Sequence, residues 1–120
     1  MRPLADAAGE ARADDSCIIA RYPVVWCEQA GHTYAGSLVL GPASFTLDGV
    51  DGGDRNVVEL SYGDLTRVRM AGARGERMRG RPTLVVDAAT TGRSIRIAAV
   101  AGAGVMGEVA DALTRAMAVA

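Results

Sequence analysis

The sequence predicts a mainly β fold of the α+β class, in which a strongly bent antiparallel sheet of six or seven strands is closed by one C-terminal helix. Three observations lead to this prediction. Apolar and polar residues alternate with a period of two over most of residues 38–99, as in antiparallel strands with one face toward water. A period near four is confined to the last segment, near residues 105–118, where a helix is expected. Strand and helix segments do not alternate and no internal repeat is present, so one domain is expected.

The N-terminal region differs from the rest of the chain. Residues 1–15 are rich in alanine, aspartate and arginine, and are predicted to form a flexible tail before a domain that spans residues 16–120. The segment CIIARYPVVWC, which begins at Cys17, is apolar and β-branched but is interrupted by Pro23. Because proline cannot donate a ladder hydrogen bond, an edge strand or a bent strand is predicted here.

Six further segments show the period-two pattern, each with its large apolar residues on one face. These residues are Leu38 and Leu40; Phe45 and Leu47; Val58, Leu60 and Tyr62; Val68 and Met70; Leu84 and Val86; and Ile95, Ile97 and Ala99. The connections contain glycine, aspartate, proline and threonine, and several have the length of a hairpin loop.

The connection DGVDGGD spaces Asp48, Asp51 and Asp54 by three residues. A calcium loop has its acids at alternate positions and ends in a distal glutamate, and this segment lacks that arrangement. Glycine and aspartate are also the residues that turns favour. A turn is therefore predicted here, and no metal.

In the last segment, Val105, Val109, Leu113 and Met117 repeat every four residues. This spacing predicts an amphipathic helix of about four turns. Its apolar stripe must pack on another element, and the sheet is the partner that the sequence offers.

The helix start contains the pattern G-x-G-x-x-G at Gly102, Gly104 and Gly107. A dinucleotide fold needs this pattern inside a β-α-β unit, with an acid about twenty residues further on. Only thirteen residues follow Gly107 in this sequence, so no dinucleotide or other cofactor is predicted. The glycines are instead expected to let the chain turn sharply and to let the helix start lie close to the sheet.

Three segments carry a resemblance to a known family: GSLVLGPASFTLDG, VVELSYGDLTRVRM and TLVVDAATTGRSIRIAAV. Together with the order of strands followed by one helix, they resemble bacterial pleckstrin-homology-like (PH-like) and GRAM-like domains over residues 17–118. The second segment matches a strand, turn and strand of that family, with Tyr62, Asp64, Leu65 and Val68 in the corresponding places. The resemblance implies a bent β-barrel scaffold that binds lipids, peptides or proteins, in most members without catalysis.

Two departures from the family limit what the resemblance implies. The phosphoinositide-binding branch has lysines and arginines in its first hairpin, and the corresponding segment CEQAGHTYAGS has none. That branch also has a tryptophan in the closing helix, whereas the single tryptophan of this chain is Trp26. Phosphoinositide binding is therefore not expected.

The strongest charge feature is residues 67–82, RVRMAGARGERMRGRP, which hold six arginines against Glu76 alone. Candidate anion-binding residues are Arg74, Arg77, Arg79 and Arg81, whose forked donors suit a lipid headgroup, a phosphorylated partner or an acidic protein. The alternative is a solvated loop in a chain whose thirteen basic residues are all arginine. Since charge runs are usually solvated and exposed ion pairs contribute little, the solvated loop is favoured.

Catalytic and metal sites are not predicted. Cys17 and Cys27 would lie roughly 33 Å apart on one extended strand, beyond disulfide reach, so both are expected to be free thiols. Together with His32 they lack the four closely spaced ligands of structural zinc. His32 is the single histidine, and no nucleophile motif surrounds it. The protein is therefore predicted not to be an enzyme.

Two function hypotheses remain open. The first is a non-catalytic module that binds a protein or peptide partner, with self-association through a sheet edge as one form of it. The second is a peripheral membrane-surface or anion-binding domain that acts through loop 74–81. The net charge of −1 and the lack of interleaved aromatic residues argue against nucleic acid. A cytoplasmic protein is expected, peripheral at the inner membrane face under the second hypothesis. The aromatic side chains Tyr22, Trp26 and Tyr34 are expected to fill the core rather than line a peptide groove.

Overall fold

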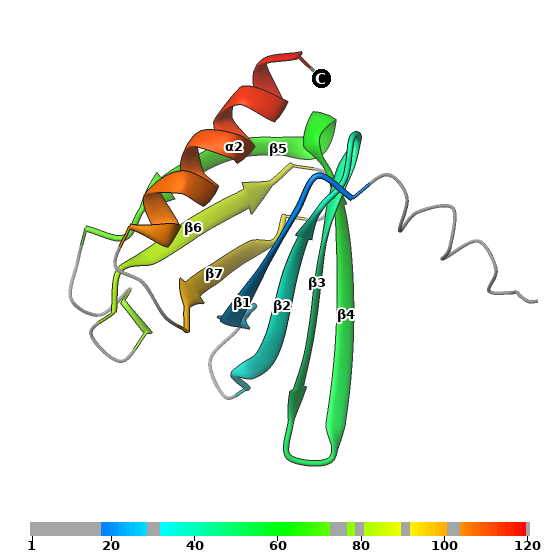
Figure 1. The fold of residues 1–120 in the computed structure, drawn as a ribbon, viewed down its shortest axis with the longest axis vertical. Coiled ribbons are helices and arrows are strands. Elements are labelled where there is room, and N and C mark those ends of the chain that lie inside the picture. Colours follow the sequence, from blue (N-terminus) through cyan, green and yellow to red (C-terminus); the bar gives the residue numbers. More distant parts are fainter. Residues whose placement is uncertain are drawn as a thin grey trace, which may run out of the picture.

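The computed structural model describes residues 18–28, 32–72, 77–78, 81–89, 92–100 and 104–119. The predicted tail, residues 1–15, lies outside them. Figure 1 shows the described strands and helices in chain order. Their bounds are β1 Ala20–Cys27, β2 Tyr34–Leu40, β3 Ser44–Asp51, β4 Asp54–Ser61, the 3-10 helix η1 Tyr62–Asp64, β5 Leu65–Met70, β6 Thr83–Ala88, β7 Ser94–Ala99 and α2 Val105–Val119.

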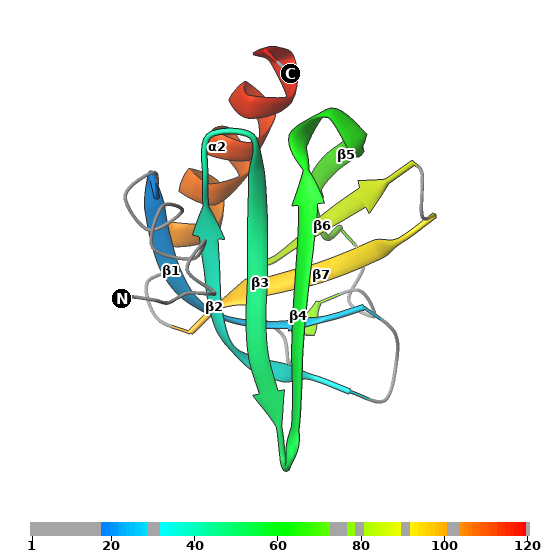
Figure 2. The same ribbon diagram turned by 90° about the vertical axis from the view of Figure 1, so that its right-hand side faces the viewer.

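The strands form one seven-stranded sheet in the order β4-β3-β2-β1-β7-β6-β5, and every neighbouring pair is antiparallel. The sheet curls into a half-barrel, and α2 packs against β5, η1, β6 and β7 to close it (Figures 1 and 2). The predicted fold class is therefore confirmed: a mainly β half-barrel of antiparallel strands closed by one helix. The helix expected near residues 105–118 is observed at Val105–Val119.

A continuous apolar core fills the inner face of the half-barrel. Its fully buried side chains are Val24, Trp26, Leu38, Phe45, Leu47, Leu84, Val86, Ile95, Ile97, Met106, Val109 and Leu113. Most were predicted from the period-two and period-four patterns. Trp26 lies in this core as expected, whereas Tyr22 and Tyr34 are only partly buried against it. Met70 departs from the pattern and is exposed, because it lies at the end of the sheet's last strand.

Strand β1 lies at the centre of the sheet, so of the two alternatives predicted at Pro23 the edge strand was wrong. The bent strand is the one observed, as Figure 2 shows. The carbonyl of Pro23 accepts a hydrogen bond from Val100 N–H (3.2 Å), which places the backbone polar groups of Pro23 on the β7 side. The paired register with β7 begins only at Val24, so the missing donor of Pro23 falls just beyond the ladder.

The segment DGVDGGD forms the predicted turn between β3 and β4. Gly52 and Gly53 make the loop, and Gly52 has a positive φ of 62°, which an L side chain rarely adopts. Asp51 and Asp54 face each other across the start of an unbroken antiparallel register. Asp48 lies further along β3 and forms an ion pair with Arg55 (3.1 Å).

Two other glycines allow a close crossing of β2 and β3. Gly36 and Gly49 face each other in the register. A Cβ on Gly36 would lie 2.0 Å from the carbonyl oxygen of Asp48, and one on Gly49 would lie 2.8 Å from Tyr34 Cβ. Trp26 packs beside Gly49 and donates its indole N–H to the Asp48 carbonyl (3.2 Å). Only glycine therefore fits at these two positions.

Two glycines of the G-x-G-x-x-G pattern, Gly104 and Gly107, do not have the close-packing role expected for them. A Cβ on Gly104 or Gly107 would meet no atom within 4 Å, so close packing of the helix start on the sheet was the wrong explanation. Gly102 lies outside the described residues. Strand β7, which precedes the helix, pairs antiparallel with both of its neighbours, whereas a dinucleotide site needs a parallel β-α-β unit.

The corner between β4 and β5 is a single 3-10 turn, as the Tyr-x-Asp match suggested. Ser61 caps this turn by accepting from the Gly63 N–H. The buried Tyr62 ring packs on Phe45, and its hydroxyl donates to the carbonyl of Gly41 (2.8 Å). Tyr62 thereby ties the corner to the β2–β3 turn.

Gly36→Ala is expected to lower the free energy of unfolding by about 1–3 kcal/mol or more, because its methyl group would overlap the β3 backbone. Gly107→Ala is the matched control. Its methyl group points into open space within a helix, so it should stabilise the protein by up to about 1 kcal/mol. Chemical denaturation of both variants measures this. Equal stability of the Gly36 variant and the wild type would contradict the close crossing.

Tyr62→Phe is expected to cost about 1 kcal/mol at pH 7, because the hydrogen bond to Gly41 is lost. Burial raises the pKa of Tyr62 above its ordinary value of 10.0. Its contribution to stability is therefore fully present below pH 10 and is lost as the pH rises through the folded-state pKa. The wild type should lose stability more steeply than the variant above pH 10, as measured by denaturation at pH 7 and at alkaline pH. Identical alkaline slopes would count against a buried Tyr62 hydroxyl.

Candidate functional site

A second, smaller apolar cluster lies on the outer face of the sheet. Strand β6 is buried on both faces, unlike an antiparallel strand with one wetted side. On the outer face Cys27 of β1 and Ala98 of β7 are buried beneath Met78, and Val25 packs against them. The described part of segment 77–81 therefore covers the outer face of the sheet.

The hydroxyl of Thr83 fixes this covering segment to the sheet. Thr83 is 1% exposed. Its hydroxyl oxygen accepts a hydrogen bond from the Met78 N–H (2.9 Å) and donates one to the Arg81 carbonyl (2.9 Å). The Arg81 N–H in turn donates to the Met78 carbonyl (3.0 Å). A buried hydroxyl that both donates and accepts a hydrogen bond holds its two partners in one arrangement.

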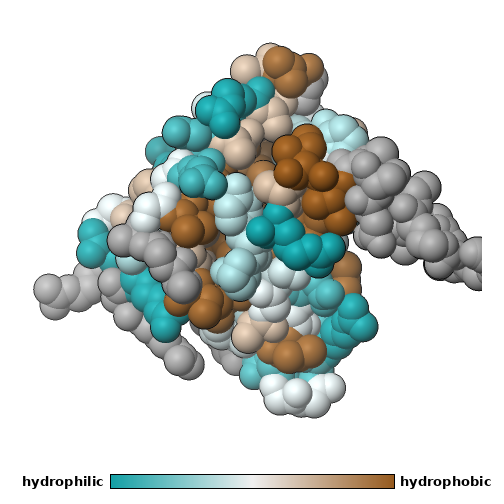
Figure 3. All heavy atoms as spheres, in the orientation of Figure 1, coloured by the Kyte–Doolittle hydropathy of each residue, from teal (hydrophilic) through white to brown (hydrophobic). Residues whose placement is uncertain are grey.

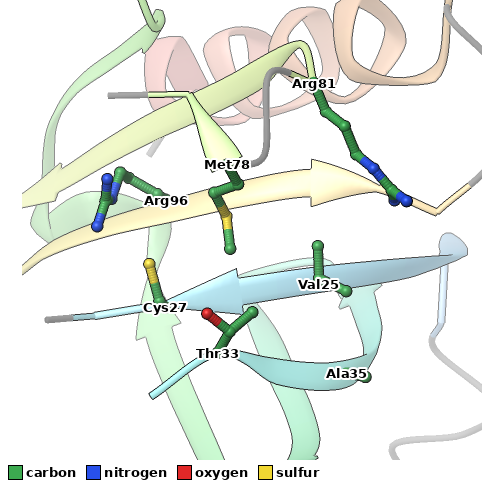
Figure 4. A pocket seen from close by; sticks show the side chains of 7 residues that line it. All are labelled: Val25, Cys27, Thr33, Ala35, Met78, Arg81 and Arg96. Atoms are coloured by element: carbon green, nitrogen blue, oxygen red, sulfur yellow. The ribbon is translucent and has the colours of Figure 1, made fainter. Parts of the chain in front are cut away.

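Beside this cluster is a groove with a cavity of about 290 Å³, which is called the outer groove below. Its lining residues are Val25, Cys27, Thr33, Ala35, Met78, Arg81 and Arg96. Figure 4 shows the Met78 side chain directed toward β1 between the two arginines, with Thr33, which precedes β2, and Ala35 of β2 along the far side. The middle of the groove is therefore apolar and rich in sulfur.

An arginine lies at each end of the outer groove (Figure 4). Arg81 donates from Nη1 to the carbonyl of Ala99, at the end of β7 (3.4 Å). Arg96 lies on β7, three residues before Ala99. It is paired with Cys27 of β1 on one side and with Val85 of β6 on the other. Arg96 and Ala99 are separated by roughly 10 Å of extended strand, so the groove presents two cationic ends with an apolar middle.

The structure describes two of the four predicted arginines, and it places these two differently. Arg81 lines the outer groove, and Arg77 is exposed and does not line it. Arg74 and Arg79 lie outside the described residues. Sequence reasoning missed Met78 and Arg96. The signal that was available is the run Leu84-Val85-Val86, since consecutive apolar residues in a strand indicate burial on both faces.

The other candidate residues have structural partners. His32 Nδ1 lies 3.0 Å from a carboxylate oxygen of Asp51, and its ring stacks near Tyr34. Cys27 is a free, buried thiol, whereas Cys17 lies outside the described residues. In the described ranges no group of three or more histidine, cysteine, aspartate or glutamate side chains could hold a metal ion.

Six large apolar residues are exposed among the described residues. They are Ile19, Val50, Val57, Met70, Val100 and Val119. On the face in Figure 3, hydrophobic residues are interrupted by hydrophilic ones, and scattered exposed apolar residues are normal for a folded domain. Within the part of the chain that the structure describes, no helix has the length and apolarity needed to cross a bilayer.

Comparison with known proteins identifies the fold. No protein-family model and no curated protein sequence matches this chain, so the GRAM-like part of the resemblance has no support from sequence. The C-terminal domain of an unknown protein from Leishmania infantum matches with a TM-score of 0.68 at 10% identity, over 94% of this chain and 99% of that one. The structure of human RhoA in complex with a DH/PH fragment of PDZRhoGEF matches with a TM-score of 0.63 at 13% identity, over 86% of this chain and 29% of that one. This chain thus spans less than a third of that chain, and at these identities the likeness shows a PH-like fold alone.

Thr83→Val is expected to lower the free energy of unfolding by about 1–3 kcal/mol, because the buried Met78 N–H and Arg81 carbonyl lose their common partner. Thr66→Val is the matched control. Its hydroxyl donates to the Asp87 carbonyl at an exposed position (3.3 Å), so its loss should cost less than about 0.5 kcal/mol. The ¹³C-methyl NMR signal of Met78 should shift only in the Thr83 variant. An unchanged Met78 signal would contradict the role given to Thr83.

Proposed function

We propose that this chain is a non-catalytic interaction module that binds an acidic, partly apolar peptide segment of a protein partner in the outer groove. The observation that carries the proposal is the arrangement of Arg81 and Arg96 at the two ends of a groove with an apolar middle. A cytoplasmic site of action belongs to the same proposal.

The chemistry of the groove selects the ligand class. Guanidinium groups bind carboxylates through two parallel N–H donors, so each end favours an aspartate, a glutamate or a terminal carboxylate. The thioether of Met78 adapts to apolar side chains of different shape. A segment with an apolar residue between two acids matches both parts of the groove.

The fold is consistent with a binding role. PH-like scaffolds serve protein and lipid interaction, generally without catalysis, although a fold by itself does not assign a ligand. The outer groove uses the convex face of β1 and β7 and the start of β2. It therefore does not depend on the first-hairpin cations that the phosphoinositide-binding branch has and this chain lacks.

The membrane-surface hypothesis for Arg74, Arg77, Arg79 and Arg81 is the alternative. The position of Arg81 favours the groove proposal over the membrane-surface hypothesis, because its hydrogen bond to the Ala99 carbonyl holds the side chain against β7. Arg77 is exposed, which is compatible with both hypotheses. Arg74 and Arg79, which lie outside the described residues, contribute no structural argument for either hypothesis.

A binding experiment tests the proposal with a defined probe. The probe is an acetylated hexapeptide with two central leucines and two glutamates at each end, and its counterpart has glutamine in place of glutamate. The glutamate peptide should bind and should shift the ¹³C-methyl signal of Met78, but not that of Met106 in the inner core. Arg81→Gln should weaken binding at least about tenfold, since a hydrogen bond to a charged group contributes about 1.5–3 kcal/mol.

The matched control is Arg77→Gln, which removes the same charge from the same segment outside the groove and should change the affinity less than about twofold. Equal binding of both peptides, or equal loss in both variants, would overturn the proposal. Co-sedimentation with phosphatidylserine vesicles at physiological salt, lost when Arg74, Arg77, Arg79 and Arg81 are all changed to serine, would establish the membrane hypothesis in its place.

A further inference from the structure

The sheet has two ends, and they differ in how well they resist pairing with another strand. Strands β4 and β5 each have a neighbour on one side only among the described residues. An unpaired strand edge is a template for another chain, and most proteins protect it with prolines, bulges, like charges or short strands.

Strand β5 has this protection. It is six residues long, its register with β6 shifts between Leu65 and Arg67, and it carries Arg67 and Arg69 on one face. A second copy of β5 would bring like charges together. Homotypic pairing at this edge is therefore disfavoured.

Strand β4 lacks such protection. It is eight residues long, contains no proline, and keeps an unbroken register with β3 from Ser61 to Asp54. Its outward-facing side chains include Arg55 and Glu59, which have opposite charge, and between them Val57, which is 53% exposed. Figures 1 and 2 show β4 at the end of the sheet, in a hairpin that projects from the body.

The hairpin register determines which backbone groups of β4 are available. In a two-residue hairpin, the two residues that flank the loop form backbone hydrogen bonds with each other, and here they are Asp51 and Asp54. Along the two strands, hydrogen-bonded pairs then recur at every second residue. Tyr62 N–H donating to the Ala43 carbonyl continues the same series beyond the strand. The backbone groups of Arg55, Val57 and Glu59 therefore point away from β3, toward the edge.

We propose that two copies of this chain associate through β4, pairing antiparallel about a twofold axis at Val57, so that one sheet continues across both copies. Val57 of each copy then faces Val57 of the other. Arg55 of each copy faces Glu59 of the other, which gives two opposite-charge pairs. This interface lies at the opposite end of the sheet from β5 and does not involve the outer groove.

Charge selects this register over its neighbours. If the second copy slides by one or three residues, a residue whose backbone groups point to the edge faces one whose backbone groups point to β3. The ladder hydrogen bonds between the copies are then lost. Sliding the second copy by two residues places Arg55 opposite Val57 or Ser61, without charge pairing. Sliding it by four places Arg55 opposite Arg55, or Glu59 opposite Glu59, and like charges directly opposite are destabilising.

Contacts within each copy hold the two charged side chains over this face. Arg55 Nε and Nη2 donate to the two carboxylate oxygens of Asp48 (3.3 and 3.1 Å). Glu59 accepts from the hydroxyl of Ser44 (2.7 Å). A guanidinium has five N–H donors and a carboxylate about four acceptor sites, so each can also bond its counterpart in the second copy.

Sedimentation velocity over a concentration series tests the proposal on the full chain. The wild type should form a dimer as the concentration rises. Val57→Lys should weaken dimerisation at least about tenfold, because two like charges would meet at the twofold axis. The matched control is Val100→Lys, a valine of similar exposure that follows β7, four strands away from β4 in the sheet, which should leave the dimer intact. Circular dichroism melting confirms that each variant is folded.

A charge exchange tests the register itself. Arg55→Glu and Glu59→Arg should each be monomeric when studied alone, because each places like charges opposite one another. When the two variants are mixed, every reversed charge faces an opposite one, and a heterodimer should form. A wild type that stays monomeric at all concentrations would overturn the proposal. So would a dimer that survives Val57→Lys, or a mixture that fails to associate.

Discussion

The close crossing of β2 and β3 at Gly36 and Gly49 is the constraint on which the rest of the structure depends. The Asp48 carbonyl occupies the space that a side chain on Gly36 would need, and Trp26 packs beside Gly49 and donates to that same carbonyl. This contact joins the central strand β1 to β3, across β2. The curled sheet has a concave face, which α2 closes, and a convex face on the other side.

The accessible convex face carries the candidate site. An antiparallel sheet with one wetted face would leave Val25, Cys27 and Ala98 in contact with water, but here Met78 covers them and Thr83 holds the covering segment in place. The outer groove lies beside this cover, and its lining includes Arg81, which precedes β6, and Arg96 of β7.

The two proposed surfaces are physically independent. The outer groove uses β1, β7 and the start of β2, near the middle of the sheet, whereas the self-pairing edge is β4 at one end. A module with this arrangement can bind a peptide and a second copy of itself at the same time. Two linked binding sites raise the effective affinity for a partner that carries two matching segments.

Side-chain spacing within a few residues was enough to predict most of the inner core, six or seven strands, the β3–β4 turn and the closing helix. The central place of β1 came from the tertiary structure, since the missing donor of Pro23 is tolerated only because the β7 ladder begins beyond it. The tertiary structure also decided that Gly36 and Gly49, rather than Gly104 and Gly107, are the glycines that permit close packing. Finally, it placed Arg81 and Arg96 at the two ends of one groove, because strand order and register determine which outer-face residues line the same groove, and local periodicity contains neither.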